Sequence, residues 1–321
     1  MAKPILLLTR QLPPAVEARA KRDYDARLRR DDLPFTGAEL ARAAEGAAGV
    51  LCAAGDALDA GTIRLLPDSV RILASFSVGT DHIALDAARA RGIAVTNTPD
   101  VLTVATAEIA MLLILMCARR AGEGERTLRD RKWTGWAPTQ LLGVTLEGKR
   151  LGVLGMGRIG RALAGMARGF GMEVHYRNRT RLTPAEEAGA VFHDDDAGFL
   201  GAIEVLSMHI PGGADTAGWL DAGRIALLRP GAIVVNTGRG TTVDDAALCA
   251  ALISGHVRAA GLDVFAGEPA IFEGYHTAPN LTLLPHLGSA TTEVRDAMGM
   301  RCLDNLDAVL LRGEDPLHRV A

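Results

Sequence analysis

The sequence has little of what marks secreted, membrane or nucleic-acid-binding proteins. Its 321 residues contain only four cysteines, widely spaced and without a C-x-x-C pair: Cys52, Cys117, Cys249 and Cys302. This spacing argues against a disulfide framework or a zinc site and favours buried thiols in a reducing compartment. The net charge of −3 offers no general attraction for nucleic acid or anionic membranes, so any phosphate recognition has to be local.

Long hydrophobic runs are missing as well. The apolar stretch at residues 5–8 is too short for the central segment of a signal peptide. The longest run, residues 104–118, contains Glu108 and falls short of the roughly 20 residues that span a bilayer. No repeat of solenoid length and no low-complexity tract is present. We therefore expect a cytoplasmic chain in which residues 104–118 form a buried helix.

What the sequence does contain is two series of short apolar runs separated by helical patterns. Such alternation predicts parallel sheets built from strand–helix units. The second series has six runs, the number of strands in a complete dinucleotide-binding fold. The first series comprises residues 5–8, 49–54, 71–76 and 93–98, and the second comprises 150–155, 172–177, 204–210, 232–238, 259–265 and 281–286. We predict helices at about 102–120, joining the two series, and at about 290–311.

A glycine-rich turn opens the second series. Gly155, Gly157 and Gly160 follow an apolar strand and precede a helix whose apolar positions include Ile159 and Leu163. In this context the first glycine permits a tight turn, the second lets the backbone approach a pyrophosphate, and the third lets helix and strand pack closely. The helix start also offers unpaired N–H groups. A glycine-rich turn without a ligand is the alternative interpretation.

Polar side chains follow three later strands, at the edge where ligands bind in open α/β sheets. They are Arg239, Asp263 with Glu268, and His286. An arginine fork can hold the carboxylate of a 2-oxo acid, and a histidine can give a proton to the adjacent carbonyl as hydride arrives. Glu268 would orient the ring and favour its protonated form. Taken singly, the arginine could be a surface cation, the glutamate a cap before Pro269, and the histidine a satisfied core residue.

Several ordered motifs together resemble the D-isomer-specific 2-hydroxyacid dehydrogenases, above all the NADPH-dependent glyoxylate/hydroxypyruvate (2-ketogluconate) reductase branch. The motifs are "SFSVGTDHI" at 75–83, "GIAVTNTPD" at 92–100, "LGVLGMGRIG" at 151–160, "NTGRG" at 236–240, "GLDVFAGEP" at 261–269 and "PHLGSAT" at 285–291. The resemblance implies an α/β fold of two doubly wound parallel-sheet domains, Rossmann-like and flavodoxin-like, with a cleft between them. It implies a substrate domain at 1–98 plus 290–321, a cofactor domain at 99–289, and a homodimer formed through the cofactor domain.

The same resemblance assigns roles to residues. Arg239, Glu268 and His286 would be catalytic, and the backbone at Val78 and Gly79 would help Arg239 and His286 to hold the substrate. The implied cofactor contacts are Thr106, Gly155, Gly157, Arg158, Ile159, Gly160, Asn178, Arg179, Thr180, His209, Pro211, Thr237, Asp263 and Gly288. No metal is implied. The chain departs from the family pattern at Gly212 and Gly213, which suggest a looser loop, and at Gly238, which is a mild change.

One residue usual in this fold is absent. In NAD-preferring relatives the second strand of the cofactor domain ends in an acid, which binds the ribose hydroxyls and repels a 2′-phosphate. The matching position here is Asn178, followed by Arg179, Thr180 and Arg181. The repulsion is therefore lost, and the arginines offer attraction. We predict NADP(H), with NAD(H) as the alternative cofactor and a solvated basic turn as the alternative interpretation.

Other functions use related scaffolds. An NAD-dependent D-2-hydroxyacid dehydrogenase of the D-glycerate or phosphoglycerate type is the main alternative, and a corepressor-like protein that senses NAD(P) is the alternative outside enzymes. Formate dehydrogenases pair the histidine with glutamine, so Glu268 argues against that activity, and phosphite oxidation is a weaker rival. Trp133 and Trp136 are interpreted as aromatic residues of a dimer core or as side chains that reach the partner's substrate site.

Overall fold

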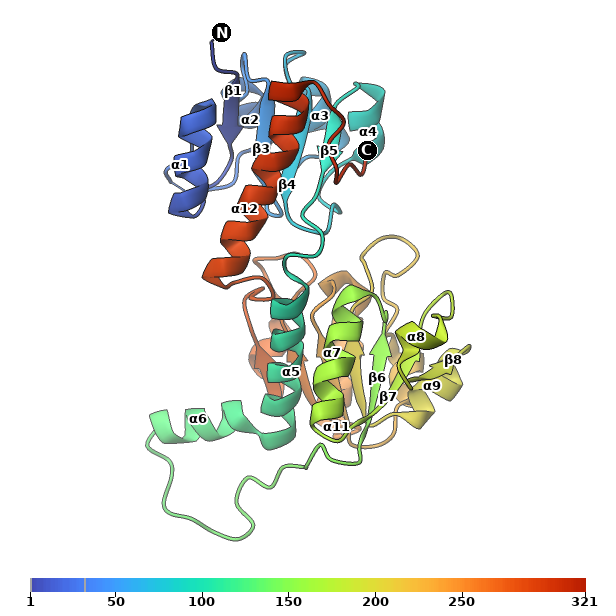
Figure 1. Ribbon diagram of the computed structural model, residues 1–321. Coiled ribbons are helices and arrows are strands. Elements are labelled where there is room, and N and C mark those ends of the chain that lie inside the picture. The colour runs from blue at the N-terminus through green and yellow to red at the C-terminus, as the bar shows by residue number, and fades with distance from the viewer. Residues whose placement is uncertain (1, 32) are drawn as a thin grey trace. The chain divides into compact units, whose positions relative to one another are not determined.

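The computed structural model describes residues 2–31 and 33–321, and the chain divides into two compact units. Unit 1 comprises residues 1–102 and 290–321, and unit 2 comprises residues 103–289 (Figure 1). Each unit is built around its own parallel sheet, flanked by helices. The predicted α/β class with two parallel-sheet domains is therefore confirmed.

Unit 1 contains five parallel strands in the order β2-β1-β3-β4-β5, the flavodoxin-like arrangement. The strands are β1 (Ile5–Leu8), β2 (Asp25–Leu28), β3 (Gly49–Ala53), β4 (Ile72–Phe76) and β5 (Ala94–Thr96). The sequence pattern missed β2, because this edge strand alternates between exposed and half-buried residues and has no apolar run. Its helices are α1 (Pro14–Asp23), α2 (Gly37–Ala43), α3 (Ala60–Leu65), α4 (Leu85–Ala90) and α12 (Thr292–Asp307), which a π-helical turn (Ala308–Arg312) extends.

The C-terminal part of the chain completes unit 1. Helix α12 packs on β4 and α1, and buries Met298, Cys302, Leu303 and Leu306. The last residues run beside β5, where the N–H of Val95 donates to the carbonyl of Ala321 over 3.0 Å. The predicted last helix is thus confirmed, and it belongs to the unit formed by the first hundred residues.

Unit 2 contains seven parallel strands in the order β12-β11-β10-β9-β6-β7-β8. They are β6 (Arg150–Leu154), β7 (Glu173–Arg177), β8 (Val191–His193), β9 (Val205–Met208), β10 (Ala232–Asn236), β11 (Val257–Leu262) and β12 (Leu281–Leu283). The six predicted strands are all present. The seventh, β8, is a short edge strand whose three residues are exposed or half-buried, so no apolar run marked it.

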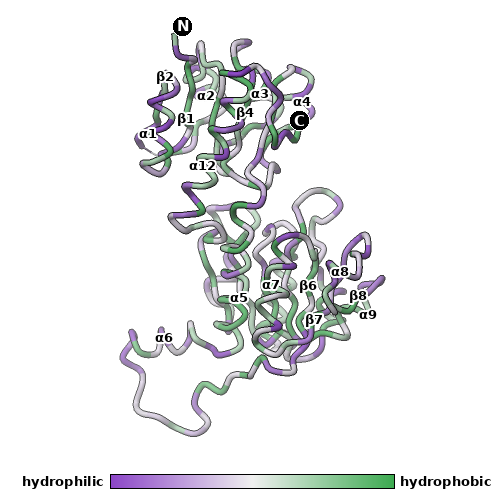
Figure 2. Tube along the Cα trace, viewed as in Figure 1, coloured by the Kyte–Doolittle hydropathy of each residue, from purple (hydrophilic) through white to green (hydrophobic). Residues whose placement is uncertain are grey.

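Helices cover the sheet of unit 2. They are α5 (Thr103–Arg119), α6 (Ala121–Arg129), α7 (Arg158–Gly169), α8 (Pro184–Glu187), α9 (Asp196–Ala202), α10 (Ala222–Leu227) and α11 (Asp245–Ser254), with short 3₁₀ turns at Gly240–Thr242 and Glu273–His276. Helix α5 confirms the predicted long helix and packs on α7, β10 and β11. In Figure 2 the strands of both sheets run through hydrophobic segments, whereas hydrophilic residues gather on loops and outer helix faces.

The cysteines and the helix lengths bear on two expectations from the sequence, namely no disulfide framework and no membrane span. All four cysteines are free and buried, as expected. Among residues 2–31 and 33–321, no helix combines the length and the apolar character that a membrane span requires.

Candidate functional site

The candidate site of unit 2 lies where its parallel strands end. Because all seven strands run in the same direction, the loops that follow them emerge at one edge of the sheet. These loops carry the glycine turn after β6, Asn178 after β7, His209 after β9, Arg239 after β10 and His286 after β12.

The glycine turn has the geometry that its motif requires. Gly155 has φ +90°, a left-handed conformation that favours glycine. A Cβ on Gly160 would lie 2.6 Å from the carbonyl oxygen of Gly155, whereas a Cβ on Gly157 would have no atom within 4 Å. Gly157 is thus open to a close approach at the start of α7, where Arg158 and Ile159 are the first helical residues. The turn can hold a pyrophosphate on backbone N–H groups.

Asn178 is tied to this turn. Its side-chain oxygen Oδ1 accepts a hydrogen bond of 2.7 Å from the N–H of Met156. The strand β7 therefore ends on a residue whose amide contacts the glycine turn directly. Because Oδ1 is bound to Met156, the Nδ2 donor of the same amide points away from that N–H.

The arginines around Asn178 differ in their partners. Arg177 pairs with Asp196 over 3.2 Å, and Arg181 pairs with the buried carboxylate of Glu187 over 2.8 Å. Arg179 and Thr180 are exposed, and within the described residues the Arg179 side chain makes no hydrogen bond or ion pair. Because its guanidinium is paired with Glu187, Arg181 is less available to a phosphate than Arg179, and its attraction for a phosphate stays a prediction.

His209 follows β9 and is held by two hydroxyl groups. Its Nε2 lies 2.9 Å from Oγ of Ser207, and its Nδ1 lies 3.1 Å from Oγ1 of Thr237. Burial lowers the pKa of His209 to about 4, so the ring is neutral at ordinary pH. The next turn is closed by Thr216, whose hydroxyl donates to the carbonyl of Pro211 over 2.7 Å. The loop expected to be loose is thus held by side-chain and backbone hydrogen bonds.

His286 and Glu268 form a pair. The ring Nδ1 of His286 lies 2.8 Å from Oε2 of Glu268, while Oε1 of Glu268 accepts a hydrogen bond of 2.8 Å from the N–H of Phe265. Burial acts to raise the pKa of Glu268, but the bonds from His286 and Phe265 outweigh it and hold the pKa below its usual value. The His286 side chain is 45% exposed, so the alternative of a satisfied core histidine is wrong.

Asp263 holds the loop that carries His286. Its carboxylate is buried and accepts hydrogen bonds from the N–H groups of Leu287 and Gly288, over 2.7 and 2.8 Å. Burial raises the pKa of Asp263, although these two donors act to lower it. Thr106 of α5 donates to the carbonyl of Gly288 over 2.9 Å. Three predicted cofactor-contact residues, Thr106, Asp263 and Gly288, thus lie together and support His286, whose φ is +56°.

Asn236 holds the turn that carries Arg239, and the sequence patterns assigned it no role. The buried side chain of Asn236 accepts a hydrogen bond from the N–H of Gly238 and donates to the carbonyl of Arg239, both over 2.9 Å. A Cβ on Gly238 would lie 2.8 Å from the carbonyl oxygen of Ile210, so glycine here is more than a mild change. A buried asparagine at a strand end, directly before a functional loop, is the signal that could have identified Asn236.

The turn of Arg239 also contacts the loop of Glu268. A Cβ on Gly240 would lie 1.9 Å from the carbonyl carbon of Phe265, so the two backbones touch at this point. Because the N–H of Phe265 binds Glu268, this contact links the arginine turn to the His286–Glu268 pair. The three predicted catalytic residues lie on three loops. The loops of Arg239 and Glu268 pack on each other, and His286 on the third loop pairs with Glu268.

Val78 and Gly79 belong to unit 1. They follow β4 at the C-terminal edge of the five-stranded sheet. The carbonyl of Val78 accepts a hydrogen bond of 2.8 Å from Nδ2 of Asn97, and the carbonyl of Gly79 accepts one of 2.6 Å from Oγ of Ser77. These backbone groups are therefore held in a defined orientation.

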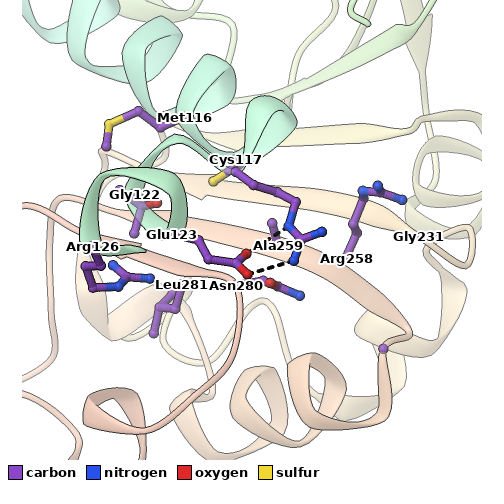
Figure 3. A pocket seen from close by; sticks show the side chains of 13 residues that line it. Met116, Cys117, Gly122, Glu123, Arg126, Gly231, Arg258, Ala259, Asn280 and Leu281 are labelled. Carbon is purple, nitrogen blue, oxygen red and sulfur yellow. Dashed lines mark hydrogen bonds and ion pairs between the residues drawn. The ribbon is translucent and has the colours of Figure 1, made fainter. Parts of the chain in front are cut away.

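A pocket of about 280 Å³ lies elsewhere in unit 2 (Figure 3). It is lined by Arg120, Glu123 and Arg126 and by residues at the starts of β11 and β12, such as Arg258 and Leu281. The pocket lies where the strands start, whereas Arg239 and His286 lie where the strands end. The pocket is therefore not the candidate site. Within the described residues, no group of three or more His, Cys, Asp or Glu side chains could hold a metal ion.

The chain is similar to known proteins. Residues 111–288 match the model of the "D-isomer specific 2-hydroxyacid dehydrogenase, NAD binding domain" family. The chain is 43% identical to a glycerate dehydrogenase of Hyphomicrobium methylovorum, with all of both chains covered. It is 39% identical to a glyoxylate reductase of Thermococcus litoralis, over 98% of this chain and 96% of the relative.

A solved structure is similar over nearly the whole chain. It is an NADPH-dependent glyoxylate/hydroxypyruvate reductase of Sinorhizobium meliloti in complex with NADP and malonate. The TM-score is 0.88 with 34% identity, covering 100% of this chain and 97% of that one.

Proposed function

The chain belongs to the D-isomer specific 2-hydroxyacid dehydrogenase family, and we propose that it reduces small 2-oxo acids to D-2-hydroxy acids with NADPH. The proposed substrates are glyoxylate and hydroxypyruvate, with 2-ketogluconate as a third candidate. The observation that carries this proposal is the 2.8 Å pair of His286 and Glu268, part-exposed at the sheet edge and linked through Phe265 to the turn of Arg239. When bound, the nicotinamide cofactor supplies the hydride.

His286 is the proposed acid and base. In reduction, its Nε2 gives a proton to the carbonyl oxygen of the substrate, and in oxidation the same nitrogen takes that proton back. Glu268 bonds Nδ1 and therefore fixes the ring direction and the nitrogen that faces the substrate. Because the pKa of Glu268 lies below its usual value, its charge is present throughout the working range of pH.

Arg239 is the proposed substrate anchor. A guanidinium fork holds a carboxylate through two parallel hydrogen bonds and can also contact the neighbouring carbonyl oxygen. From the family resemblance we also propose that the backbone N–H groups of Val78 and Gly79 bind substrate carboxylate. A fork that contacts carboxylate and carbonyl together selects acids with a carboxylate directly beside the reacting carbonyl, which defines the 2-oxo acids.

The proposed cofactor contacts follow the sheet edge of unit 2. The glycine turn with Arg158 and Ile159 would hold the pyrophosphate, and Thr106, His209, Pro211, Thr237, Asp263 and Gly288 would line the nicotinamide half. Asn178, Arg179 and Thr180 would hold the 2′-phosphate. Support for NADPH comes from the neutral Asn178, the exposed Arg179, and the NADP in the similar reductase of S. meliloti.

A kinetic panel tests the proposal. The purified chain is assayed with glyoxylate, hydroxypyruvate, 2-ketogluconate, pyruvate and phenylpyruvate, each with NADPH and with NADH. We expect the highest kcat/KM with NADPH and with glyoxylate or hydroxypyruvate. Absence of turnover with every acid would contradict the proposed reaction and favour a cofactor-sensing protein, which would still bind NADPH in a titration.

The similarity to a glycerate dehydrogenase favours one second candidate, the NAD-dependent oxidation of D-glycerate. Hydroxypyruvate and D-glycerate are the two sides of one redox couple, so the two candidates differ in cofactor and direction and share their chemistry. Comparing D-glycerate oxidation with NAD⁺ and with NADP⁺ separates them. A strong preference for NAD⁺ would favour this candidate.

We also propose a homodimer formed through unit 2 and a cytoplasmic location. After α6 the chain runs as an extended stretch (Figure 1). This stretch exposes large apolar side chains, including Trp136, which is 81% exposed, and Trp133, which is 52% exposed. Such side chains on an arm of the chain are suited to cover a second copy. Light scattering of the wild type and of Trp136→Ala measures the mass directly.

The proposed cytoplasmic location is supported by the cysteines, because four free thiols fit a reducing compartment.

A further inference from the structure

We infer that Asn97 and Ser77 in unit 1, and Asn236 in unit 2, are positioning residues for the carboxylate of the substrate. This inference rests on the proposed function, in which Val78, Gly79 and Arg239 bind that carboxylate. None of the three side chains is proposed to touch the substrate. Each instead binds the backbone of the loop that does.

In unit 1, three successive carbonyl groups after β4 accept hydrogen bonds. The carbonyl of Ser77 accepts a hydrogen bond of 2.9 Å from the N–H of Thr98. The carbonyl of Val78 accepts one of 2.8 Å from Nδ2 of Asn97. The carbonyl of Gly79 accepts one of 2.6 Å from Oγ of Ser77. The first two bonds attach the loop after β4 to the segment after β5, its neighbour in the sheet, and the third closes the loop on itself.

These contacts determine where the N–H groups point. In a planar trans peptide the C=O and the N–H are directed to opposite sides. When the carbonyls of Ser77 and Val78 are bound to residues 97 and 98, the N–H groups of Val78 and Gly79 must face away from them. Two neighbouring N–H groups held in this way form a concave donor site that suits an anion such as a carboxylate.

The positioning side chains are themselves supported. Oγ of Ser77 lies 2.7 Å from Oγ of Ser75, which lies 3.3 Å from Nε2 of His82. Ser75 is fully buried and Ser77 is nearly so. The N–H of Asn97 donates to the carbonyl of His318 over 3.3 Å, so the C-terminal part of the chain holds its backbone. Preorganised donors of this kind bind without the cost of ordering a loop.

Asn236 has the corresponding place in unit 2. It is fully buried at the end of β10 and closes the turn of residues 236–239 with one acceptor and one donor. Oγ1 of Thr242 also donates to the carbonyl of Arg239, over 2.7 Å. The backbone of Arg239 is therefore held by the amide of Asn236 together with the hydroxyl of Thr242, much as Asn97 and the N–H of Thr98 hold the loop of Val78 and Gly79 in unit 1.

The experiment compares the full-length variants Asn97→Ala, Ser77→Ala and Asn236→Asp with Thr98→Val. Thr98 is adjacent to Asn97 and fully buried, but its hydroxyl has no hydrogen-bond partner among the described residues, so Thr98→Val is a matched control. Asn236→Asp retains the acceptor for Gly238 and loses the donor to Arg239. The readouts are KM for glyoxylate, kcat, the Kd for NADPH and Tm.

We expect each of the three variants to raise KM for glyoxylate about tenfold, the effect of losing one hydrogen bond, with a smaller change in kcat. The Kd for NADPH should stay within about twofold of wild type, and Thr98→Val should match wild type in every readout. An unchanged KM in folded Asn97→Ala and Ser77→Ala would overturn the inference. So would equal weakening of NADPH and glyoxylate, which indicates a general loss of structure. Failure of the proposed function is a separate result, namely wild type without turnover.

Discussion

The side-chain oxygen of Asn178 lies 2.7 Å from the backbone nitrogen of Met156, so the residue after β7 is hydrogen-bonded to the glycine turn after β6. An aspartate could accept the same hydrogen bond. The side chain at position 178 can therefore change charge without losing its contact with the turn, which makes cofactor preference testable by a single substitution.

We predict that Asn178→Asp moves the cofactor preference toward NADH. The new carboxylate would repel a 2′-phosphate and could bond the ribose hydroxyls instead. A repulsion of a few kcal/mol between charges about 4 Å apart near a protein surface corresponds to roughly a 10²-fold fall in the ratio of kcat/KM for NADPH to kcat/KM for NADH. Steady-state kinetics with both cofactors measures this ratio. An unchanged ratio in a folded variant would remove Asn178 from the cofactor site.

The two exposed arginines after β7 offer a matched pair. Arg179→Ala should raise the KM for NADPH roughly tenfold and leave the KM for NADH unchanged, because the lost charge is proposed to bind only the 2′-phosphate. Arg181→Ala should leave both KM values unchanged and lower Tm, because it deprives the buried carboxylate of Glu187 of its 2.8 Å partner. The opposite pattern would show that Arg181 leaves Glu187 when cofactor binds.

Glu268→Gln should lower kcat/KM for reduction roughly 10²-fold, because a neutral amide replaces the charged acceptor that bonds Nδ1 of His286 over 2.8 Å. His286→Asn should cost roughly 10²- to 10⁴-fold with NADPH binding retained. Steady-state kinetics of both variants measures these losses, and a Glu268→Gln variant with the kcat/KM of wild type would contradict the pairing.

His209 should make the protein sensitive to acid. Its pKa is about 4 in the folded chain because burial disfavours the charged ring, whereas an unfolded histidine titrates near 6.5. Between these values the unfolded chain binds more protons, so this contribution to stability is complete above about pH 6.5 and is lost as the pH falls toward 4. Urea unfolding at pH 7.5 and 4.5 should show a smaller difference for His209→Gln than for wild type. An equal difference would count against the lowered pKa.

Two glycine substitutions should have opposite effects. Gly240→Ala places a Cβ 1.9 Å from the backbone of Phe265 and should displace both Arg239 and the loop of Glu268, lowering kcat/KM more than tenfold. Gly165→Ala, within α7, meets no atom within 4 Å and should stabilise the protein by about 1 kcal/mol without affecting activity. Thermal unfolding and kinetics of both variants test the expectation. Normal activity of Gly240→Ala would show that the two loops are not linked.

Short-range patterns in the sequence predicted much of the fold. Buried parallel strands such as β6 and β10 are continuous apolar runs, and α5 and α12 lie close to where their sequences predicted. The edge strands β2 and β8 were missed, because strands with exposed faces have no such run. Their existence depends on pairing with a neighbouring strand.

The sequence by itself determined which chemical groups end the strands: the glycine turn, Asn178, Arg239, Glu268 and His286. Strand direction, turn chemistry and residue type are local properties, so a pattern reveals them. Only the tertiary structure decided which of these groups are available and which are held. Arg181 is paired with Glu187, and the loops of Val78 and Arg239 are bound by Asn97 and Asn236. Such contacts depend on how loops and neighbouring strands pack, and the local pattern of any one segment does not specify its partners.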